Sequence, residues 1–322
     1  MPEASEIRVA ICIATFRRQE LLRELLVGLA QLTFHKARKP HIQIVVVDND
    51  ELASAEEICD DVSIPWPIKY VVEPRRGITH ARNRTIAEVS SADFVAFIDD
   101  DEIPSAHWLD ELLWAQEKFS ADVVSGPVLP RYASEVADWV KRGRFFEGRT
   151  SATGATRRGC AANNALVGTH VFVRVPGFDD DFALSGAEDT NFFLRVWQAG
   201  YKIVWSQEAF VWETVSAARG TVAWLVRREY QTGNGWVFCE RILDNHLRSK
   251  AVRFCNASGH VAIGSASLLW RCALLDWTGI VRSLQRIGLG AGMLAGLAGC
   301  RFLAYNTAGA HQEGTVSRVT AG

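Results

Sequence analysis

The sequence lacks the compositional features that mark several common protein classes. Its 322 residues carry a net charge of −2, so the excess of basic side chains typical of nucleic-acid-binding proteins is missing. The seven cysteines are an odd number and form no C-x-x-C pair, which excludes a fully paired disulfide set and an obvious zinc site. Residues 1–8 are acidic and polar, unlike a secretory signal. We therefore expect a cytoplasmic protein that does not bind nucleic acid.

The sequence also lacks the glycine-rich loops with which many nucleotide-binding folds hold phosphate groups. There is no G-x-G-x-x-G after the first apolar run and no P-loop G-K-[ST] anywhere. Apolar runs that are typical of buried parallel strands occupy residues 9–15, 42–47, 68–72 and 94–98. Helical patterns follow through the leucines between 21 and 29, over 81–89 and over 104–119. This alternation predicts an α/β fold with a mostly parallel sheet flanked by helices.

Two of the predicted strands end in clustered acids. Asp48 and Asp50 follow one strand, and the run 99–102, of sequence Asp-Asp-Asp-Glu, follows another. The carboxyl ends of parallel strands meet at one edge of a sheet, where ligands bind. Because adjacent carboxylates repel one another, a divalent cation that bridges to a phosphate is a natural counter-charge. The alternative is a solvated acidic turn that begins the next helix.

Five short segments resemble, in their order and separations, the family-2 glycosyltransferases, which are inverting enzymes of the GT-A fold. The segments are Ile13–Arg18, Val46–Asp50, Ala81–Asn83, Asp99–Asp101 and Glu188–Asp189. Within that family, the likeness is nearest to bacterial enzymes that extend exopolysaccharide units of the succinoglycan type. The resemblance implies transfer of a sugar from a nucleotide-diphosphate sugar, with UDP or dTDP as the nucleotide, to a glycan or lipid-linked saccharide.

The resemblance implies that the donor is bound at the carboxyl edge of the sheet. The residues that it assigns to donor binding are Thr15, Phe16, Arg18, Asp48, Asp50, Arg82, Asp99 and Asp100. Of these, either Asp48 or Asp50 would accept a hydrogen bond from N3–H of uracil or thymine. Asp101 would coordinate Mg²⁺ or Mn²⁺, with Asp99 as the alternative within the D-x-D pattern. Glu213 stands where many relatives carry a metal-binding histidine, and it is either a further ligand or a surface residue.

The Glu188–Asp189 pair at the start of a predicted helix is the implied catalytic site. Asp189 would act as the general base that removes a proton from the acceptor hydroxyl, and Glu188 would orient it. The structural alternative is that both acids simply stabilise the first turn of the helix.

Two further pairs of residues extend the predicted site. Asn163 and Asn164 either bond to sugar or phosphate or form a turn. Arg227 and Arg228 either hold a diphosphate or lie on a solvated helix face. Their segment lacks the Gln-x-x-Arg-Trp motif of processive enzymes, so the resemblance implies one sugar per encounter.

The composition becomes more apolar toward the C-terminus. We expect a GT-A catalytic domain over 1–240, divided into a nucleotide-binding half of about 8–125 and an acceptor half of about 126–240, and a helical segment over 241–322. Gly288, Gly292 and Gly296 recur at a spacing that permits close helix packing. The apolar stretches 261–281 and 287–305 pack on the catalytic domain, lie on the inner-membrane surface or span the membrane.

Two other functions compete with the transferase. A sugar-phosphate nucleotidyltransferase shares a nucleotide-binding α/β sheet, but its glycine-rich, basic N-terminal loop is missing here. A non-catalytic protein on a degenerate transferase fold would bind sugar nucleotide or glycan, but loss of the acid run or of the Glu-Asp pair would be expected in it.

Overall fold

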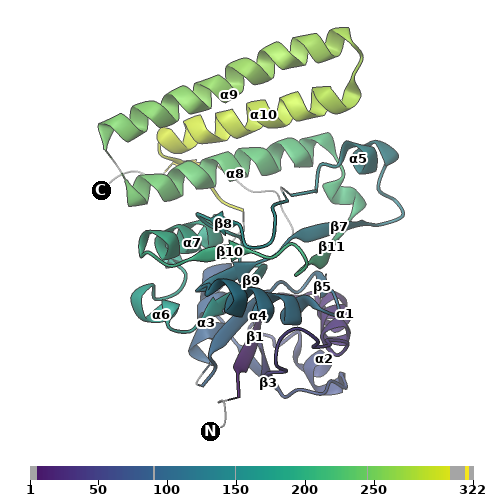
Figure 1. Ribbon diagram of the computed structural model, residues 1–322. Coiled ribbons are helices and arrows are strands. Elements are labelled where there is room, and N and C mark those ends of the chain that lie inside the picture. Colours follow the sequence, from purple (N-terminus) through teal and green to yellow (C-terminus); the bar gives the residue numbers. More distant parts are fainter. Residues whose placement is uncertain (1–5, 90, 149, 245, 305–315, 319–322) are drawn as a thin grey trace. The chain divides into compact units, whose positions relative to one another are not determined.

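The computed structural model describes residues 6–304, apart from 90, 149 and 245, together with 316–318. Its largest element is an eight-stranded sheet with strand order β3-β2-β1-β4-β9-β6-β10-β8 (Figure 1). The strands are β1 (Arg8–Thr15), β2 (His41–Asp48), β3 (Ile68–Val72), β4 (Phe94–Ile98), β6 (Val123–Ser125), β8 (Thr156–Arg157), β9 (Asn164–Gly168) and β10 (Ile203–Trp205). The four strands predicted from the sequence are therefore confirmed.

The first four strands run parallel and bring their carboxyl ends to one edge. Thr15 at the end of β1 pairs with Asp48 at the end of β2, and Asp48 pairs with Val72 of β3. On the other side, β1 pairs in parallel with β4, which ends just before the acid run. Strand β9 is antiparallel to both of its neighbours, β4 and β6. The sheet is thus mostly parallel, as predicted.

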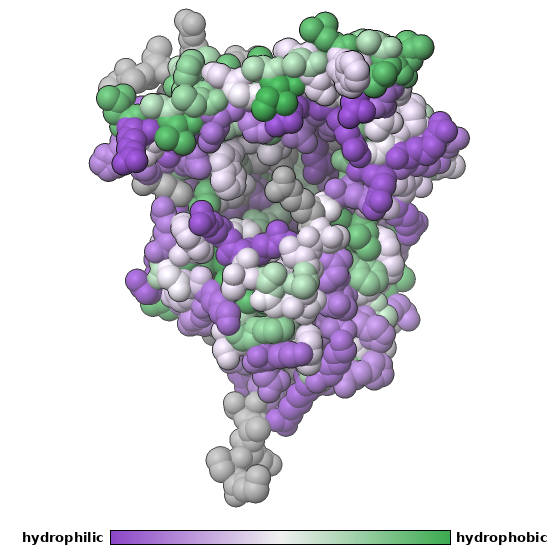
Figure 2. All heavy atoms as spheres, turned by 45° about the horizontal axis from the view of Figure 1, so that its top comes forward, coloured by the Kyte–Doolittle hydropathy of each residue, from purple (hydrophilic) through white to green (hydrophobic). Residues whose placement is uncertain are grey.

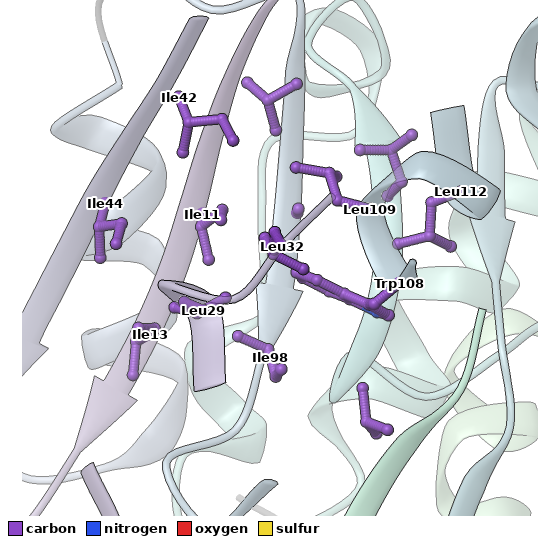
Figure 3. Close-up of a cluster of buried hydrophobic side chains, with 14 of the residues drawn as sticks. Ile11, Ile13, Leu29, Leu32, Ile42, Ile44, Ile98, Trp108, Leu109 and Leu112 are labelled. Atoms are coloured by element: carbon purple, nitrogen blue, oxygen red, sulfur yellow. The ribbon is translucent and has the colours of Figure 1, made fainter. Parts of the chain in front are cut away.

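Helices cover both faces of this sheet because successive residues of its strands are apolar and point to opposite faces. On one face, Ile11 and Ile13 of β1 pack with α1 (Gln19–Leu29), α2 (Glu56–Asp61) and α4 (Trp108–Phe119). On the other face, Ala10 and Cys12 pack with α3 (Ile78–Ala87), α6 (Val171–Arg174) and α7 (Glu188–Gln198). Figure 3 shows part of the first cluster, with the Trp108 ring lying among leucine and isoleucine side chains.

A second, three-stranded sheet changes the predicted start of one helix. It has the order β5-β11-β7 and consists of β5 (Glu102–Pro104), β11 (Val211–Val215) and β7 (Val128–Tyr132). The sequence predicted a helix from Pro104, but α4 begins at Trp108, because residues 102–104 pair with β11. A proline is compatible with the edge of a sheet, where its missing N–H is not needed.

The contacts between residues divide the chain into two compact units. The first contains residues 1–131, 146–183 and 191–214, and the second contains 132–145, 184–190 and 215–322. The second unit includes α5 (Asp138–Gly143), α8 (Val222–Leu243), α9 (Leu247–Ala273), α10 (Trp277–Leu297) and the strands β12 (Cys300–Phe302) and β13 (Val316–Arg318). Two short 3₁₀ turns, η1 (Asp180–Phe182) and η2 (Ala217–Arg219), complete the elements of the described residues.

Helices α8, α9 and α10 form the body of the second unit, with α10 packed along both of the others (Figure 1). The predicted glycine spacing is confirmed as a packing feature, because α10 approaches α8 closely at three successive turns. A Cβ atom on Gly292 would lie 2.0 Å from the Tyr230 carbonyl oxygen, and one on Gly288 would lie 2.8 Å from that of Val226. In the part of the chain that is described, no helix is both long enough and apolar enough to cross a membrane.

Candidate active site

Two strand ends in the first unit, those of β1 and β4, bring a hydroxyl, an arginine and the acid run together. The Thr15 hydroxyl donates a hydrogen bond to Asp100 at 2.8 Å. Arg18 follows three residues later and donates to Asp100 at 2.9 Å and to Asp101 at 3.1 Å. Thr15 and Arg18 therefore lie at the acid run, and their part in donor binding stays a prediction.

A second arginine pairs with the remaining aspartate of the run. Arg82 of α3 donates to Asp99 at 2.8 Å, and its side chain is only 8% exposed. The acid run is thus compensated by two guanidinium groups that come from different helices or helix ends. Guanidinium forks also match phosphate oxygens, so the same two arginines are suited to a diphosphate.

Glu102, the last acid of the run, is a site residue that the sequence analysis did not single out. Its side chain is buried, and it accepts hydrogen bonds from the Asp99 backbone N–H at 3.1 Å and from the Asn163 amide at 2.7 Å. Burial, followed by the nearby Asp99 carboxylate, raises the pKa of Glu102 well above its ordinary value. The buried Glu102 side chain therefore holds the backbone of the acid run in place through its hydrogen bond with the Asp99 N–H. The signal in the sequence was its place as the fourth acid of the run.

The surroundings of Asp101 fit a divalent cation. Burial raises the pKa of Asp101 to about 6, and the Asp99 carboxylate adds to this effect. The Glu213 carboxylate also raises the pKa of Asp101. Glu213 lies on β11, where it pairs in register with Glu102. Across the described residues, no group of three or more His, Cys, Asp or Glu side chains is arranged to hold a metal by itself. Mg²⁺ bound to substrate phosphates usually needs only one or two protein carboxylates, so Asp101 and its neighbours suffice for this type of site.

The two acids after β2 have different environments. Asp48 is fully buried and accepts hydrogen bonds from the Ala55 N–H at 2.7 Å, the Tyr70 hydroxyl at 2.9 Å and the Asp50 N–H at 3.0 Å. These bonds hold the loop that follows β2. Asp50 instead binds Arg17 through two bonds of 2.7 and 3.1 Å, and that guanidinium is half exposed. Asp50 is also buried, with 4% of its side chain exposed, but unlike Asp48 it is paired with a side chain that reaches solvent. Which of the two acids accepts a hydrogen bond from the base stays a prediction.

Phe16 provides an aromatic face next to Asp50. The Arg76 guanidinium lies 3.5 Å from the centre of the Phe16 ring, and the Arg17 guanidinium lies 5.0 Å from it. Asn49 positions the loop that carries Arg76, since its amide donates to the carbonyl of Arg75 at 2.7 Å. Arg17 has a φ of +52°, a strained value for a residue with a side chain. The sequence analysis assigned a role to Phe16 but not to Arg17 or Arg76, although both belong to Arg-Arg pairs in predicted loops.

Asn164 has a structural role rather than the predicted contact with sugar or phosphate. Its amide nitrogen donates to the carbonyls of Ala209 at 2.8 Å and Pro127 at 3.1 Å, and its oxygen accepts from the Trp108 indole at 2.8 Å. The side chain is 1% exposed. Asn163 is different, because it bonds to Glu102 and so reaches the acid run.

Glu188 and Asp189 begin α7 and belong to the second unit. Asp189 accepts hydrogen bonds from the Thr190 N–H at 2.6 Å and the Thr190 hydroxyl at 3.3 Å, and Glu188 is buried. Helix α8 supports the segment that leads to them, because the Cys239 thiol donates to the Ala187 carbonyl at 3.5 Å. Burial raises the pKa of Cys239, and the carboxylates of Asp189 and Glu188 raise it further. Both acids are therefore anchored at the start of α7, as predicted.

Arg227 and Arg228 lie on α8 in the second unit. The Arg227 guanidinium is 5.5 Å from the centre of the Phe302 ring, and the Arg228 guanidinium is 5.3 Å from that of Trp224. Arg228 is exposed and Arg227 is partly buried. Their role toward a diphosphate stays a prediction.

The sheet and the site together define a class of protein. A mostly parallel sheet whose carboxyl edge carries acids and arginines, in place of a glycine-rich loop, is the arrangement of a GT-A fold. The fold resembles that of the mannosyltransferase PcManGT from Pyrobaculum calidifontis, solved with GDP-Man and Mn²⁺, with a TM-score of 0.64, 19% identity, and coverage of 91% of this chain and 88% of that one. It also resembles residues 1–349 of TarS from S. aureus, with a TM-score of 0.50 and 14% identity over 92% and 94% of the chains.

The sequence comparisons identify the family. Residues 10–178 match the model of glycosyl transferase family 2. The chain is 31% identical to the succinoglycan biosynthesis protein ExoM of Rhizobium meliloti (strain 1021), over 93% of this chain and 95% of that protein. It is 26% identical to the glucosyl-dolichyl phosphate glucuronosyltransferase of Haloferax volcanii, over 74% and 77% of the chains. The chain belongs to glycosyl transferase family 2, which makes it a glycosyltransferase rather than a sugar-phosphate nucleotidyltransferase.

Proposed function

We propose that the protein is a metal-dependent inverting glycosyltransferase. It moves one sugar per encounter from a UDP- or dTDP-sugar to a glycan or lipid-linked saccharide in cell-surface polysaccharide synthesis, at the cytoplasmic face of the inner membrane. Two relatives support the acceptor class by their names, because one takes part in succinoglycan biosynthesis and the other acts on glucosyl-dolichyl phosphate. The Mn²⁺ in the mannosyltransferase complex supports a divalent cation.

One observation carries this proposal: Arg18 binds Asp100 and Asp101 while the Thr15 hydroxyl also binds Asp100. Arg18 is 43% exposed, so its guanidinium is free to turn toward a ligand, whereas Asp100 is held in the protein. When a donor diphosphate arrives, Arg18 and Arg82 exchange carboxylate oxygens for phosphate oxygens. The carboxylates that they release are Asp99, Asp100 and Asp101.

The released carboxylates have separate tasks in the proposed mechanism. Asp100 or Asp99 accepts a hydrogen bond from the ribose, while Asp101, assisted by Asp99 or Glu213, holds Mg²⁺ or Mn²⁺. When bound, this cation supplies Lewis-acid stabilisation of the departing nucleoside diphosphate. Asp50 accepts N3–H of the base, and Phe16 stacks on it.

Inversion requires a single displacement at the anomeric carbon. Asp189 removes the proton of the acceptor hydroxyl as the oxygen attacks, and the bond to the nucleoside diphosphate breaks on the opposite side. General-base assistance of this kind typically contributes about 10²–10⁴-fold to the rate. Glu188, buried one residue earlier, positions Asp189. The inverting mechanism, the class of acceptor and the role of Asp189 as the base are all part of the proposal.

The test separates donor binding from proton transfer. Release of UDP from UDP-glucose and UDP-galactose, and of dTDP from dTDP-rhamnose, is measured with Mn²⁺ and with EDTA, and the UDP dissociation constant is measured by calorimetry. Asp101→Asn is expected to weaken Mn²⁺-dependent UDP binding, whereas the exposed Asp60→Asn serves as the matched control. Asp189→Asn is expected to keep the affinity for UDP and to lose transfer by at least about 10²-fold. Turnover of Asp189→Asn at the wild-type rate, or UDP binding that is indifferent to EDTA, contradicts the proposal.

A further inference from the structure

A polar pocket lies between α9 and α10, close to the turn that joins them in the second unit. Its volume is about 200 Å³. The lining residues are Ser267, Arg271, Asp276, Thr278, Gly279, Arg282, Ser283 and Arg286. Three of these eight are arginines and one is an acid, so the lining carries a net charge of +2. A pocket with this charge and several hydroxyl groups suits an anion.

Asp276, the acid in this pocket, uses its carboxylate to hold the turn between α9 and α10. Asp276 accepts the Gly279 N–H at 2.9 Å as the N-cap of α10 and binds Arg271 at 2.7 Å. Arg282 donates to the carbonyl of Gly143 at 3.0 Å, which uses one of its five N–H groups. Arg286 is exposed and makes no hydrogen bond or ion pair with any residue that the structure describes. The pocket therefore offers donors that no internal acceptor occupies.

Large apolar side chains are exposed around the same turn. They are Leu269, Trp270, Leu274, Leu275 and Trp277. Leu275 is 88% exposed and Trp270 is 63% exposed, although such residues are normally buried. Figure 2 shows apolar side chains gathered along the edge of the molecule at which α9 lies in Figure 1. We call these five residues the apolar corner.

The charge of residues 245–304 indicates which class of partner binds at this turn. Between residues 245 and 304 there are seven lysines and arginines and a single acid, Asp276. Arg248, Arg271, Arg282 and Arg286 are exposed, whereas Arg253 is buried and paired with Glu240. A basic surface with exposed tryptophans and leucines is the pattern of a protein segment that lies in the interface of an anionic bilayer. A soluble anion would account for the arginines but not for the apolar corner, and an apolar protein partner would not account for the arginines.

We propose that the α9–α10 turn is a binding site for an anionic phospholipid of the bilayer. The phosphate of the headgroup enters the pocket and contacts Arg271, Arg282 and Arg286, while the apolar corner enters the boundary of the acyl chains. The site brings the enzyme to the membrane that carries a lipid-linked acceptor, and in this respect it rests on the proposed function. Its existence does not depend on that function, because lipid binding requires no donor.

Vesicle sedimentation of the full chain tests the site. Vesicles of phosphatidylcholine alone are compared with vesicles that also contain phosphatidylglycerol, at low and high salt. Each basic side chain near an anionic surface contributes about fivefold to binding. We expect Arg286→Gln to weaken binding to the anionic vesicles by about this factor, whereas the control Arg248→Gln, an exposed arginine at the far end of α9, weakens it less. The double variant Trp270→Ser/Leu275→Ser is expected to lose binding, and Val173→Ser, which removes an exposed apolar side chain of the first unit, to keep it.

The outcomes are distinct. Equal binding to both kinds of vesicle, or equal losses for Arg286→Gln and Arg248→Gln, overturns the proposal. A shift of the melting temperature by inorganic phosphate that disappears in Arg286→Gln, without vesicle binding, assigns the pocket to a soluble phosphate and also overturns it. Release of UDP from the soluble donor is measured in the same samples. Wild-type release without vesicle binding refutes only the lipid site, and vesicle binding without donor turnover refutes only the transferase mechanism.

Discussion

At the scale of single residues, the donor site of this protein is a set of carboxylates held by arginines. Asp50 is bound by Arg17, Asp99 by Arg82, and the pair Asp100 and Asp101 by Arg18. In each pair, a carboxylate that the proposed mechanism uses is bound to a guanidinium group. A bound nucleotide sugar would displace that guanidinium group or share it. Such pairing favours the ionised form of these carboxylates. At Asp100 and Asp101 burial is the larger effect, and the pKa of each is raised in spite of Arg18.

The different environments of Asp48 and Asp50 lead to the first prediction. Loss of a hydrogen bond to a charged group costs about 1.5–3 kcal/mol, so Asp50→Ala should weaken UDP binding by about 10–100-fold. Asp48→Asn should leave the affinity of the folded protein unchanged and lower its stability, because Asp48 holds Ala55 and Tyr70. Calorimetric titration with UDP and a thermal melt measure both quantities. The opposite pattern would assign the base contact to Asp48.

The second prediction concerns the pH dependence of the same contact. The hydrogen bond from Arg17 lowers the pKa of Asp50 below its ordinary value. A carboxylate whose pKa is lowered in the folded state keeps its charge at every pH above its ordinary pKa. It loses that charge only as the pH falls through the lowered pKa. The difference between wild-type and Asp50→Ala affinities for UDP should therefore be constant from about pH 5 to 8. A decline of that difference within this range would show that Arg17 does not hold the carboxylate in its ionised form.

At the scale of the elements, strands and helices are joined by buried polar contacts as well as by apolar packing. Asn164 at the start of β9 connects the Trp108 indole of α4 with the carbonyls of Pro127 and Ala209. In the second unit, α8 and α10 meet through glycines, which let their backbones approach more closely than larger residues allow. These contacts fix how elements pack without taking part in chemistry.

The third prediction follows from the contacts of Asn164. A buried polar group that loses its partner costs about 1–3 kcal/mol. Asn164→Ala leaves two such groups, the Trp108 indole N–H and the Ala209 carbonyl, since the Pro127 carbonyl keeps its hydrogen bond from the Val211 N–H. We expect the free energy of unfolding, measured by urea denaturation, to fall by at least about 2 kcal/mol, while the affinity of the folded protein for UDP is kept. A weakened UDP affinity with unchanged stability would restore the role in ligand binding that the sequence suggested.

The fourth prediction compares two glycines in neighbouring helices. Gly292→Ala places a methyl group 2.0 Å from the Tyr230 carbonyl oxygen and should destabilise the protein by about 1–3 kcal/mol. The matched control is Gly259→Ala in α9, where nothing lies within 4 Å of the added atom. Because alanine is favoured over glycine in helices, this control should stabilise the protein by about 0.4–1 kcal/mol. Similar effects of the two changes in urea denaturation would mean that the two helices do not pack as described.

At the scale of the whole molecule, the functional residues are divided between two compact units. The acid run, Asp50 and Phe16 belong to the first unit, while Glu188 and Asp189 belong to the second. The expected boundary near residue 240 falls inside α8, and the division into a catalytic domain and a C-terminal segment stays a prediction. A ligand that binds only the native state stabilises the unit that holds it.

The fifth prediction uses this division. UDP with Mn²⁺ at about 100 times the dissociation constant should raise the free energy of unfolding by about 2.7 kcal/mol. Hydrogen exchange should slow at 13–18, 48–51 and 99–102, and remain unchanged in α9. EDTA should abolish the effect of the metal. Protection that is confined to α9 would place the nucleotide somewhere other than at the carboxyl edge of the sheet.

The sequence alone determined the first four strands of the large sheet and the edge at which they end. The runs at 42–47 and 94–98 are apolar because parallel strands are buried on both faces, and the acids that follow them mark the carboxyl edge. The start of α4 was predicted wrongly, because residues 102–104 follow a pairing with β11 that lies more than 100 residues away along the chain. Such a pairing leaves no local signal.

Only the tertiary structure decided which polar residues serve the fold and which are open to a ligand. Asp48 and Asp50, like Asn163 and Asn164, are near-neighbours of the same chemical type, and no periodicity separates them. Hydrogen-bond partners that are distant in the sequence hold Asp48 and Asn164 in the interior. The same holds for the acid run. Its four carboxylates are recognisable in the sequence, but the pairing of Arg18 with Asp100 and Asp101, and of Arg82 with Asp99, follows from which strands and helices end at one place.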